Sequence, residues 1–171
     1  MRMTHIQLFL EELDREVTRS RHALEQVPAN SRDWKPHDRS MAFGPLCDMV
    51  ATIPSWLAMI LQRDSLDVAP KEKPSFTPPK STTAEEYVAA LDAAATEARN
   101  ALRATDEAFL ETPWQLMAGG KVVQEAPRRQ MLRDSINHWA HHRGQMTVYL
   151  RLLGAKVPSI YGPSADDRTF G

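Results

Sequence analysis

Four long stretches of the chain place apolar side chains at three- and four-residue intervals, the spacing that forms one apolar face on an α-helix. None of these stretches can bury that face alone, so they are expected to pack against one another. The sequence predicts an all-α four-helix bundle, built as a single domain over residues 1–171. The predicted helices cover residues 4–27, 44–62, 83–106 and 127–153, followed by an irregular tail over 154–171.

Prolines and glycines mark the long connections between these helices. Four prolines within residues 63–80 exclude a helix there and indicate an extended loop. Residues 112–127 hold two short apolar segments around Gly119–Gly120, which predicts a small hairpin or an ordered loop before the last helix. Thr83, with Glu86 three residues on, predicts a capping box at the start of the third helix. Pro54 predicts a kink in the second.

Charge and composition argue against several classes of partner. The net charge of −1 and the pI near 6.6 provide no positive field to attract nucleic acid. Cys47 is the single cysteine, so an internal disulfide is impossible, as is typical of a reducing compartment. The mostly apolar run over residues 49–61 is too short to span a bilayer, and the N-terminus is unlike a signal peptide. We therefore predict a cytosolic protein without nucleic-acid or membrane partners.

The arginines of the last predicted helix are spread around it by the helical repeat. Because the chain is nearly neutral, we interpret them as a solvated face and not as a binding patch. They are Arg128, Arg129, Arg133, Arg143 and Arg151.

The most informative pattern lies in the same helix, where His138 and His142 are four residues apart. At this spacing the two side chains stack on one helix face, which also carries Gln145 and Tyr149. Two neutral imidazoles so placed can share a divalent metal. Paired histidines can equally hydrogen-bond to neighbours or water, so the spacing leaves both interpretations open.

The run H-x-x-x-H-R-G-Q-x-x-x-Y-L-R-x-x-G-x-x-V-P over residues 138–158 resembles the last helix and tail of DinB-like proteins. Residues 34–41, 44–56 and 114–120 are similar to other parts of the same family, so the resemblance covers most of the chain. It implies a four-helix bundle of the DinB/YfiT type and a homodimer. It also implies a site in which three histidines bind a divalent metal such as zinc, nickel or iron.

The family's two ligands on the last helix carry over to His138 and His142. The third, on the second helix, falls on Met49. A thioether suits Cu(I) far better than zinc, nickel or iron. Met49 also heads the apolar stripe of its helix, which favours a core role, since methionine readily fills irregular gaps.

Several side chains are conceivable substitutes for the missing ligand. His37, in the loop before the second helix, could fold over the site, and His5 and Glu12 share one face of the first helix. Cys47 and Asp48 neighbour the third-ligand position but point away from it. Each of these residues also has an ordinary structural role open to it.

The resemblance implies a metal-dependent activity on a small-molecule substrate, either S-transfer to or from a low-molecular-weight thiol or hydrolysis. His138 and His142 would be the metal ligands, with Gln145 or Tyr149 orienting a ligand, water or substrate. The alternative is a catalytically inactive homodimer of the same fold, without metal, that serves a binding or structural role. Met49 favours this alternative unless another side chain completes the site.

Overall fold

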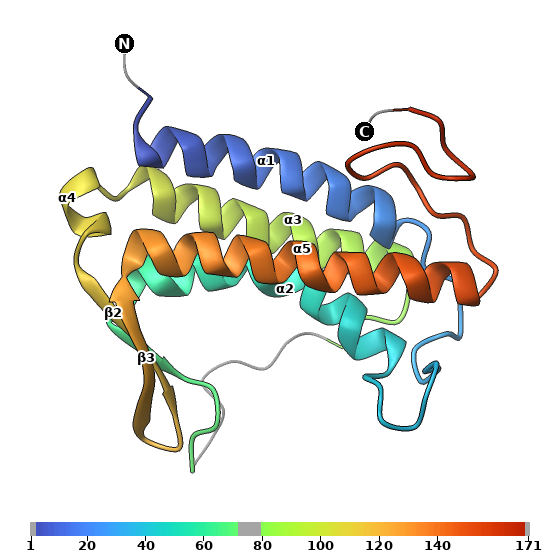
Figure 1. The fold of residues 1–171 in the computed structure, drawn as a ribbon, viewed down its shortest axis with the longest axis horizontal. Helices are drawn as coiled ribbons and strands as arrows, with labels where there is room; N and C mark the ends of the chain where they lie inside the picture. Colours follow the sequence, from blue (N-terminus) through green and yellow to red (C-terminus); the bar gives the residue numbers. More distant parts are fainter. Residues whose placement is uncertain (1–2, 72–79, 170–171) are drawn as a thin grey trace.

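The computed structural model describes residues 3–71 and 80–169. Four long helices lie side by side in it (Figure 1). They are α1 (His5–Leu24), α2 (Phe43–Gln62), α3 (Ala84–Arg103) and α5 (Arg128–Leu152). Both α1 and α2 pack against α3 and α5. Each helix begins and ends within three residues of its predicted bounds, because all four follow the apolar repeat closely.

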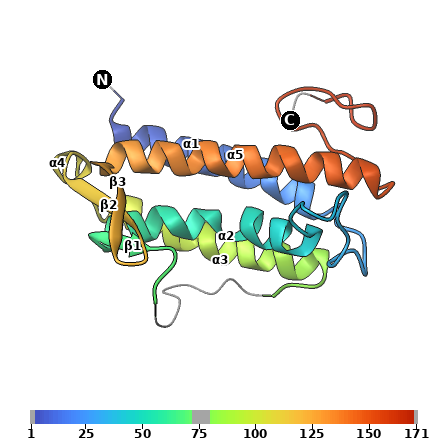
Figure 2. The ribbon, with the colours of Figure 1, turned by 60° about the horizontal axis from the view of Figure 1, so that its bottom comes forward.

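The prediction of an all-α fold is wrong in one respect, since the described residues also form a small mixed sheet. Its strands are β1 (Ser65–Asp67), β2 (Pro113–Ala118) and β3 (Lys121–Pro127) (Figure 2). A short helix, α4 (Glu107–Leu110), leads into β2. The antiparallel β2–β3 hairpin turns at Gly119 and Gly120, both at positive φ, as the glycine pair indicated.

Strand β1 pairs in parallel with β2 and draws part of the predicted extended loop into the sheet. Its three residues carry no recognisable alternation, so only the pairing with β2 makes it a strand. Residues 72–79 of that predicted loop lie outside the described residues, as do the last two of the predicted tail. The described tail, residues 154–169, is irregular as expected.

Helix α2 is the most buried of the long helices. It is long and apolar enough to cross a membrane, yet 83% of its most apolar stretch is buried inside the fold, as in the core helix of a globular protein. Pro54 lies inside it, and the axis of α2 changes direction along its length (Figure 1). Proline cannot donate to the carbonyl four residues earlier, that of Val50. The Trp139 indole donates to this carbonyl instead, over 2.7 Å, and so joins α2 to α5.

Two capping boxes fix the starts of α1 and α3. At α3, Thr83 accepts from the Glu86 amide and the Glu86 side chain accepts in return, which confirms the predicted capping box. At α1, Thr4 and Gln7 make the same reciprocal pair. A cap of this kind is typically worth about 1 kcal/mol of helix stability.

Arg128 and Arg143 are buried and hydrogen-bonded, so the prediction of a solvated arginine face is wrong for these two. Arg128 joins the sheet to the end of α2 by donating to the carbonyls of Ile60 and Arg63 and to Asp64. Burial of a guanidinium is tolerated where carbonyl and carboxylate partners surround it, as they do here.

Candidate functional site

The two histidines of the motif meet on the surface of α5. The Nε2 atoms of His138 and His142 are 2.8 Å apart, and the ring centroids are 4.4 Å apart. His142 is half-buried, and His138 is the more exposed of the two. The helical spacing therefore brings two nitrogen donors to one point, as the sequence indicated.

Gln145, one turn beyond, determines the proton positions in this pair. Its Oε1 lies 2.8 Å from Nδ1 of His142. A carbonyl oxygen only accepts, so Nδ1 of His142 carries the proton and its Nε2 keeps a lone pair. Among residues 3–71 and 80–169, Nε2 of His138 has His142 as its hydrogen-bond partner, so it donates to that lone pair. Gln145 thus holds His142 in the tautomer whose Nε2 is unprotonated and faces His138.

Both histidines are held in their neutral form. Burial lowers the pKa of His138, and the nearby His142 and His141 lower it further. Burial also lowers the pKa of His142, with His141 adding to the effect and the Gln145 hydrogen bond opposing it. Since a protonated imidazole cannot coordinate a metal, the lowered pKa values keep the pair competent as ligands at neutral pH.

Met49, at the expected third-ligand position, is half-buried and packs against the hydrophobic core. Within residues 3–71 and 80–169, no third histidine, cysteine, aspartate or glutamate joins the pair to form a group of three. His37, a proposed substitute, accepts at Nδ1 from the Arg39 amide over 3.1 Å and so helps to order its own loop.

Cys47 and Asp48 are both committed to the interior of the protein. Burial raises the pKa of the Cys47 thiol, so it stays protonated and unreactive. Asp48 accepts from Arg32 over 2.7 Å and from the Ser81 amide over 3.2 Å. Neither side chain is a substitute ligand, in agreement with the directions expected from the helix.

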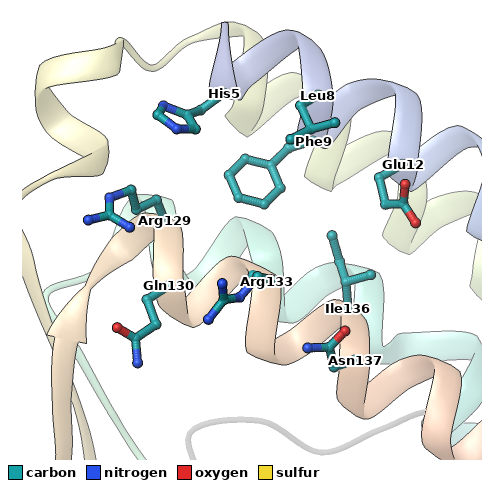
Figure 3. Close-up of a pocket in the computed structure, with 9 residues that line it drawn as sticks. All are labelled: His5, Leu8, Phe9, Glu12, Arg129, Gln130, Arg133, Ile136 and Asn137. Atoms are coloured by element: carbon teal, nitrogen blue, oxygen red, sulfur yellow. The ribbon is translucent and has the colours of Figure 1, made fainter.

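His5 and Glu12 line a different cavity, of about 340 Å³, between α1 and α5. Figure 3 shows them on α1, with Arg129 and Arg133 on α5. His5 contacts Glu107 over 2.9 Å, so its Nδ1 already has a carboxylate partner. The residues that line this cavity do not include the histidine pair, and His5 and Glu12 are not brought to the site.

Tyr149 lies further along α5 and serves the loop before α2. Its ring packs edge-on against Trp34, and its hydroxyl donates to the carbonyl of Met41 over 3.4 Å. Of the two helpers expected from the helix face, Gln145 contacts the pair and Tyr149 orders the neighbouring loop.

A second cavity, of about 320 Å³, opens directly beside His138. Helices α2 and α5 form one side of it and the small sheet forms the other. Trp56 packs against the His138 ring with centroids 5.4 Å apart, so one aromatic wall joins the cavity to the histidine pair. No pattern in the sequence predicted the sheet side of this cavity. The lining residues are Trp56, Ile60, Leu66, Val68, Trp114, Leu116, Gln124, Met131, Asp134, Ser135 and His138.

The protein is therefore a helical bundle with a small sheet and a histidine pair on its last helix. Known proteins are similar to it. The family model described as the DinB family matches residues 2–169. This chain belongs to the DinB family.

Two solved structures share the fold. A DinB-like protein from Bacillus cereus ATCC 10987 has a TM-score of 0.70 and 24% identity, over 90% of this chain and 95% of that one. The DinB-like protein YjoA from Bacillus subtilis has a TM-score of 0.65 and 15% identity, over 94% of this chain and 99% of that one. At these identities the similarity establishes the fold and carries no statement about activity.

Among curated proteins, the uncharacterized protein YrdA of Bacillus subtilis (strain 168) is 48% identical to this chain over 46 residues. The match covers 27% of this chain and 28% of that protein. The similarity is therefore high but local.

Proposed function

We propose that this protein binds a divalent metal ion through His138 and His142 and uses it to activate a thiol or a water molecule against a small-molecule substrate. The observation that carries the proposal is the convergence of the two Nε2 atoms, 2.8 Å apart, with His142 oriented by Gln145. In metal sites, a ligating histidine usually donates a hydrogen bond from its other ring nitrogen, as Nδ1 of His142 does here to Gln145.

The geometry fits a metal ion after a small adjustment. Two imidazole nitrogens on one tetrahedral zinc lie about 3.3 Å apart, given Zn–N bonds of about 2.0–2.1 Å. The pair would therefore open by about half an ångström, and His138 would give up the proton it now donates. Because His138 is exposed, this movement disturbs no core packing.

A metal held by two imidazoles keeps coordination positions open and lowers the pKa of a bound thiol or water. The chain's own residues would do the rest. Gln145 keeps the proton of His142 on Nδ1, and Trp56 covers one side of His138. The exposed side of the pair leaves room for a substrate or a thiol to approach.

The second candidate function is a DinB-fold protein that kept the structure and lost the chemistry, as an inactive homodimer. Met49 is the observation that favours it, because a half-buried thioether packed on the core stands where the family resemblance implies an imidazole. The two candidates differ in one measurable property, the affinity of the histidine pair for a metal.

Zinc titration by calorimetry tests the proposal on three proteins: the unchanged chain, His142→Ala and His141→Ala. His141 is an exposed neighbour of the pair and serves as the matched control. We expect His142→Ala to weaken zinc binding by at least about 100-fold, because even indirect changes around a metal cost about 10–100-fold. Equal zinc affinity in all three proteins would place the ion elsewhere and overturn the proposal.

A further inference from the structure

We propose that the cavity beside His138 binds a neutral, apolar ring, about the size of one or two fused aromatic rings, and holds it against the histidine pair. This names the substrate class for the proposed function and rests on it for the role of the pair. Binding of the ring itself requires only the cavity.

The size of the cavity sets the first limit on the ligand. Its volume of about 320 Å³ lies at the lower end of the range of small-molecule sites, about 300–1,000 Å³. A bicyclic aromatic group fits within it, whereas a long peptide does not. The ligand is therefore a compact molecule or the compact part of a larger one.

The lining sets the second limit, because its walls are mainly apolar and aromatic. Trp56 comes from α2 and Trp114 from β2, so an indole lies on the helical side and another on the sheet side. Ile60, Leu66 and Leu116 add aliphatic surface. Flat apolar rings pack well between such side chains, through burial of apolar area and through offset or edge-on aromatic contacts.

Charge sets the third limit. Among the described residues that line the cavity, Asp134 and His138 are the ionisable ones. No described lining residue is a lysine or arginine that would pair with an anion. A carboxylate or phosphate ligand would meet Asp134 and apolar walls, which disfavour an unpaired charge. The cavity therefore selects a neutral ring over an anionic one.

Position links the cavity to the site. His138 belongs both to the lining and to the pair, and its ring packs against Trp56 with centroids 5.4 Å apart. A ring held in the cavity therefore lies beside the point where the two Nε2 atoms converge. The small sheet supplies the outer wall through Leu66, Leu116 and Gln124, so it has a role in forming the binding site.

Calorimetric titration of metal-free protein with two matched probes tests the proposal. The probes are naphthalen-2-ylmethanol, which is neutral, and 2-naphthoate, which differs by carrying a carboxylate. We expect the alcohol to bind at least about 10-fold more tightly than the carboxylate, since burying an unpaired charge is unfavourable. Equal or tighter binding of 2-naphthoate would overturn the proposed selectivity.

Three substitutions locate the bound ring. Leu116→Trp fills the cavity from β2, and Val68→Trp narrows it from a position that is 59% exposed, where a larger side chain does not disturb the core. Val123→Trp adds the same indole on β3, outside the cavity, and is the control. The first two should weaken binding of the alcohol at least about 10-fold, and the control should leave it unchanged. The same affinity in all four proteins would place the ring elsewhere.

Cobalt(II) separates failure of this inference from failure of the proposed function. If the ring lies against the histidine pair, saturating alcohol should shift the visible absorption bands of the cobalt-loaded protein, and Leu116→Trp should abolish that shift while still binding cobalt. Cobalt spectra unaffected by a bound ring would overturn the link to the pair. Absence of cobalt binding would contradict the proposed function. The metal-free titration would still test whether the cavity binds the ring.

Discussion

His142 and Arg143 are adjacent in the chain but lie in opposite environments. His142 is half-buried at the surface and forms hydrogen bonds with Gln145 and His138. Arg143 is completely buried and donates to Glu16 on α1 and to the hydroxyl of Tyr161 in the tail. Successive residues of a helix point about 100° apart, so one short motif serves two sides of α5.

The difference shows which part of the motif holds the fold and which part is free for chemistry. The arginine side is built around Glu16, which accepts from Arg143, from Arg19 over 2.6 Å and from Tyr161 over 2.9 Å. The histidine side places two imidazole nitrogens at the surface, where His138 donates to the Nε2 lone pair of His142. The sequence run that identifies the family therefore combines a structural anchor for the tail with a candidate ligand pair.

The largest expected effect comes from breaking the anchor. Arg143→Ala leaves the carboxylate of Glu16 buried without its main cation, which should lower the free energy of unfolding by about 3–5 kcal/mol. Urea denaturation measures this, with Arg133→Ala as an exposed control that should change stability by less than about 0.5 kcal/mol. A loss for Arg143→Ala as small as that of the control would show that the anchor is dispensable.

The same anchor should depend on pH. Burial alone would raise the pKa of Glu16, but Arg143, Arg19 and Tyr161 together bring it below the ordinary 4.5. The stability that the Glu16 carboxylate contributes is therefore present above pH 4.5, and it is lost as the pH falls through the lower pKa of Glu16 in the folded state. The deficit of Arg143→Ala relative to the unchanged chain should shrink over that window, in urea titrations at stepped pH.

Trp139→Phe tests the hydrogen bond that joins α5 to α2 beside the histidine pair. It removes the donor to the Val50 carbonyl, which Pro54 leaves without its helical partner. An unsatisfied buried carbonyl costs about 1–3 kcal/mol, and thermal unfolding should register that loss. Pro54→Ala in the same background should restore part of it by returning an amide donor. If the double variant is no more stable than Trp139→Phe, the assigned role of the indole is wrong.

Gln145→Ala acts on the histidine side alone. Without Oε1 to hold the proton on Nδ1, His142 loses its preferred tautomer, and zinc affinity should fall by about 10–100-fold. Folding stability should be unchanged within about 0.5 kcal/mol, because Gln145 is exposed. If Gln145→Ala lost stability and kept its zinc affinity, the histidine side of α5 would serve the fold and not metal binding, which would contradict this assignment.

The smallest expected effect is the pH dependence of the histidine pair. Burial lowers the pKa of both His138 and His142 below the ordinary 6.5, so the folded state binds fewer protons than the unfolded state just below that pH. Stability should therefore decrease slightly as the pH falls through 6.5 and should level off below the folded-state pKa values. A His138→Ala, His142→Ala double variant should lack this slope; a slope identical to that of the unchanged chain would assign it to other groups.

Local patterns predicted much of this molecule. The apolar repeats located the four long helices, and the four-residue spacing located the histidine pair, because both depend on the geometry of a single helix. Thr83 and Glu86 likewise fixed the start of α3. What local patterns could not supply is contact between distant segments: the Glu16–Arg143 pair is 127 residues apart in the chain, and its burial contradicts the usual exposure of charged side chains.

Strand β1 and the cavity were beyond prediction for the same reason, whereas the β2–β3 hairpin had a local signal in Gly119–Gly120. β1 has three residues and becomes a strand only by pairing with β2, about 50 residues away. The cavity needs that sheet as its outer wall, so no single segment signals it. The candidate ligands could therefore be named from the sequence, whereas the space beside them needed the fold.

The most direct test of the central claim, that His138 and His142 bind a metal with methionine at position 49, is elemental analysis of the protein purified without a histidine tag, beside Met49→His and His142→Ala. We predict near-stoichiometric metal in the unchanged chain and its loss in His142→Ala. Little metal in the unchanged chain, with stoichiometric metal in Met49→His, would contradict the claim and would identify the protein as a metal-free member of the family.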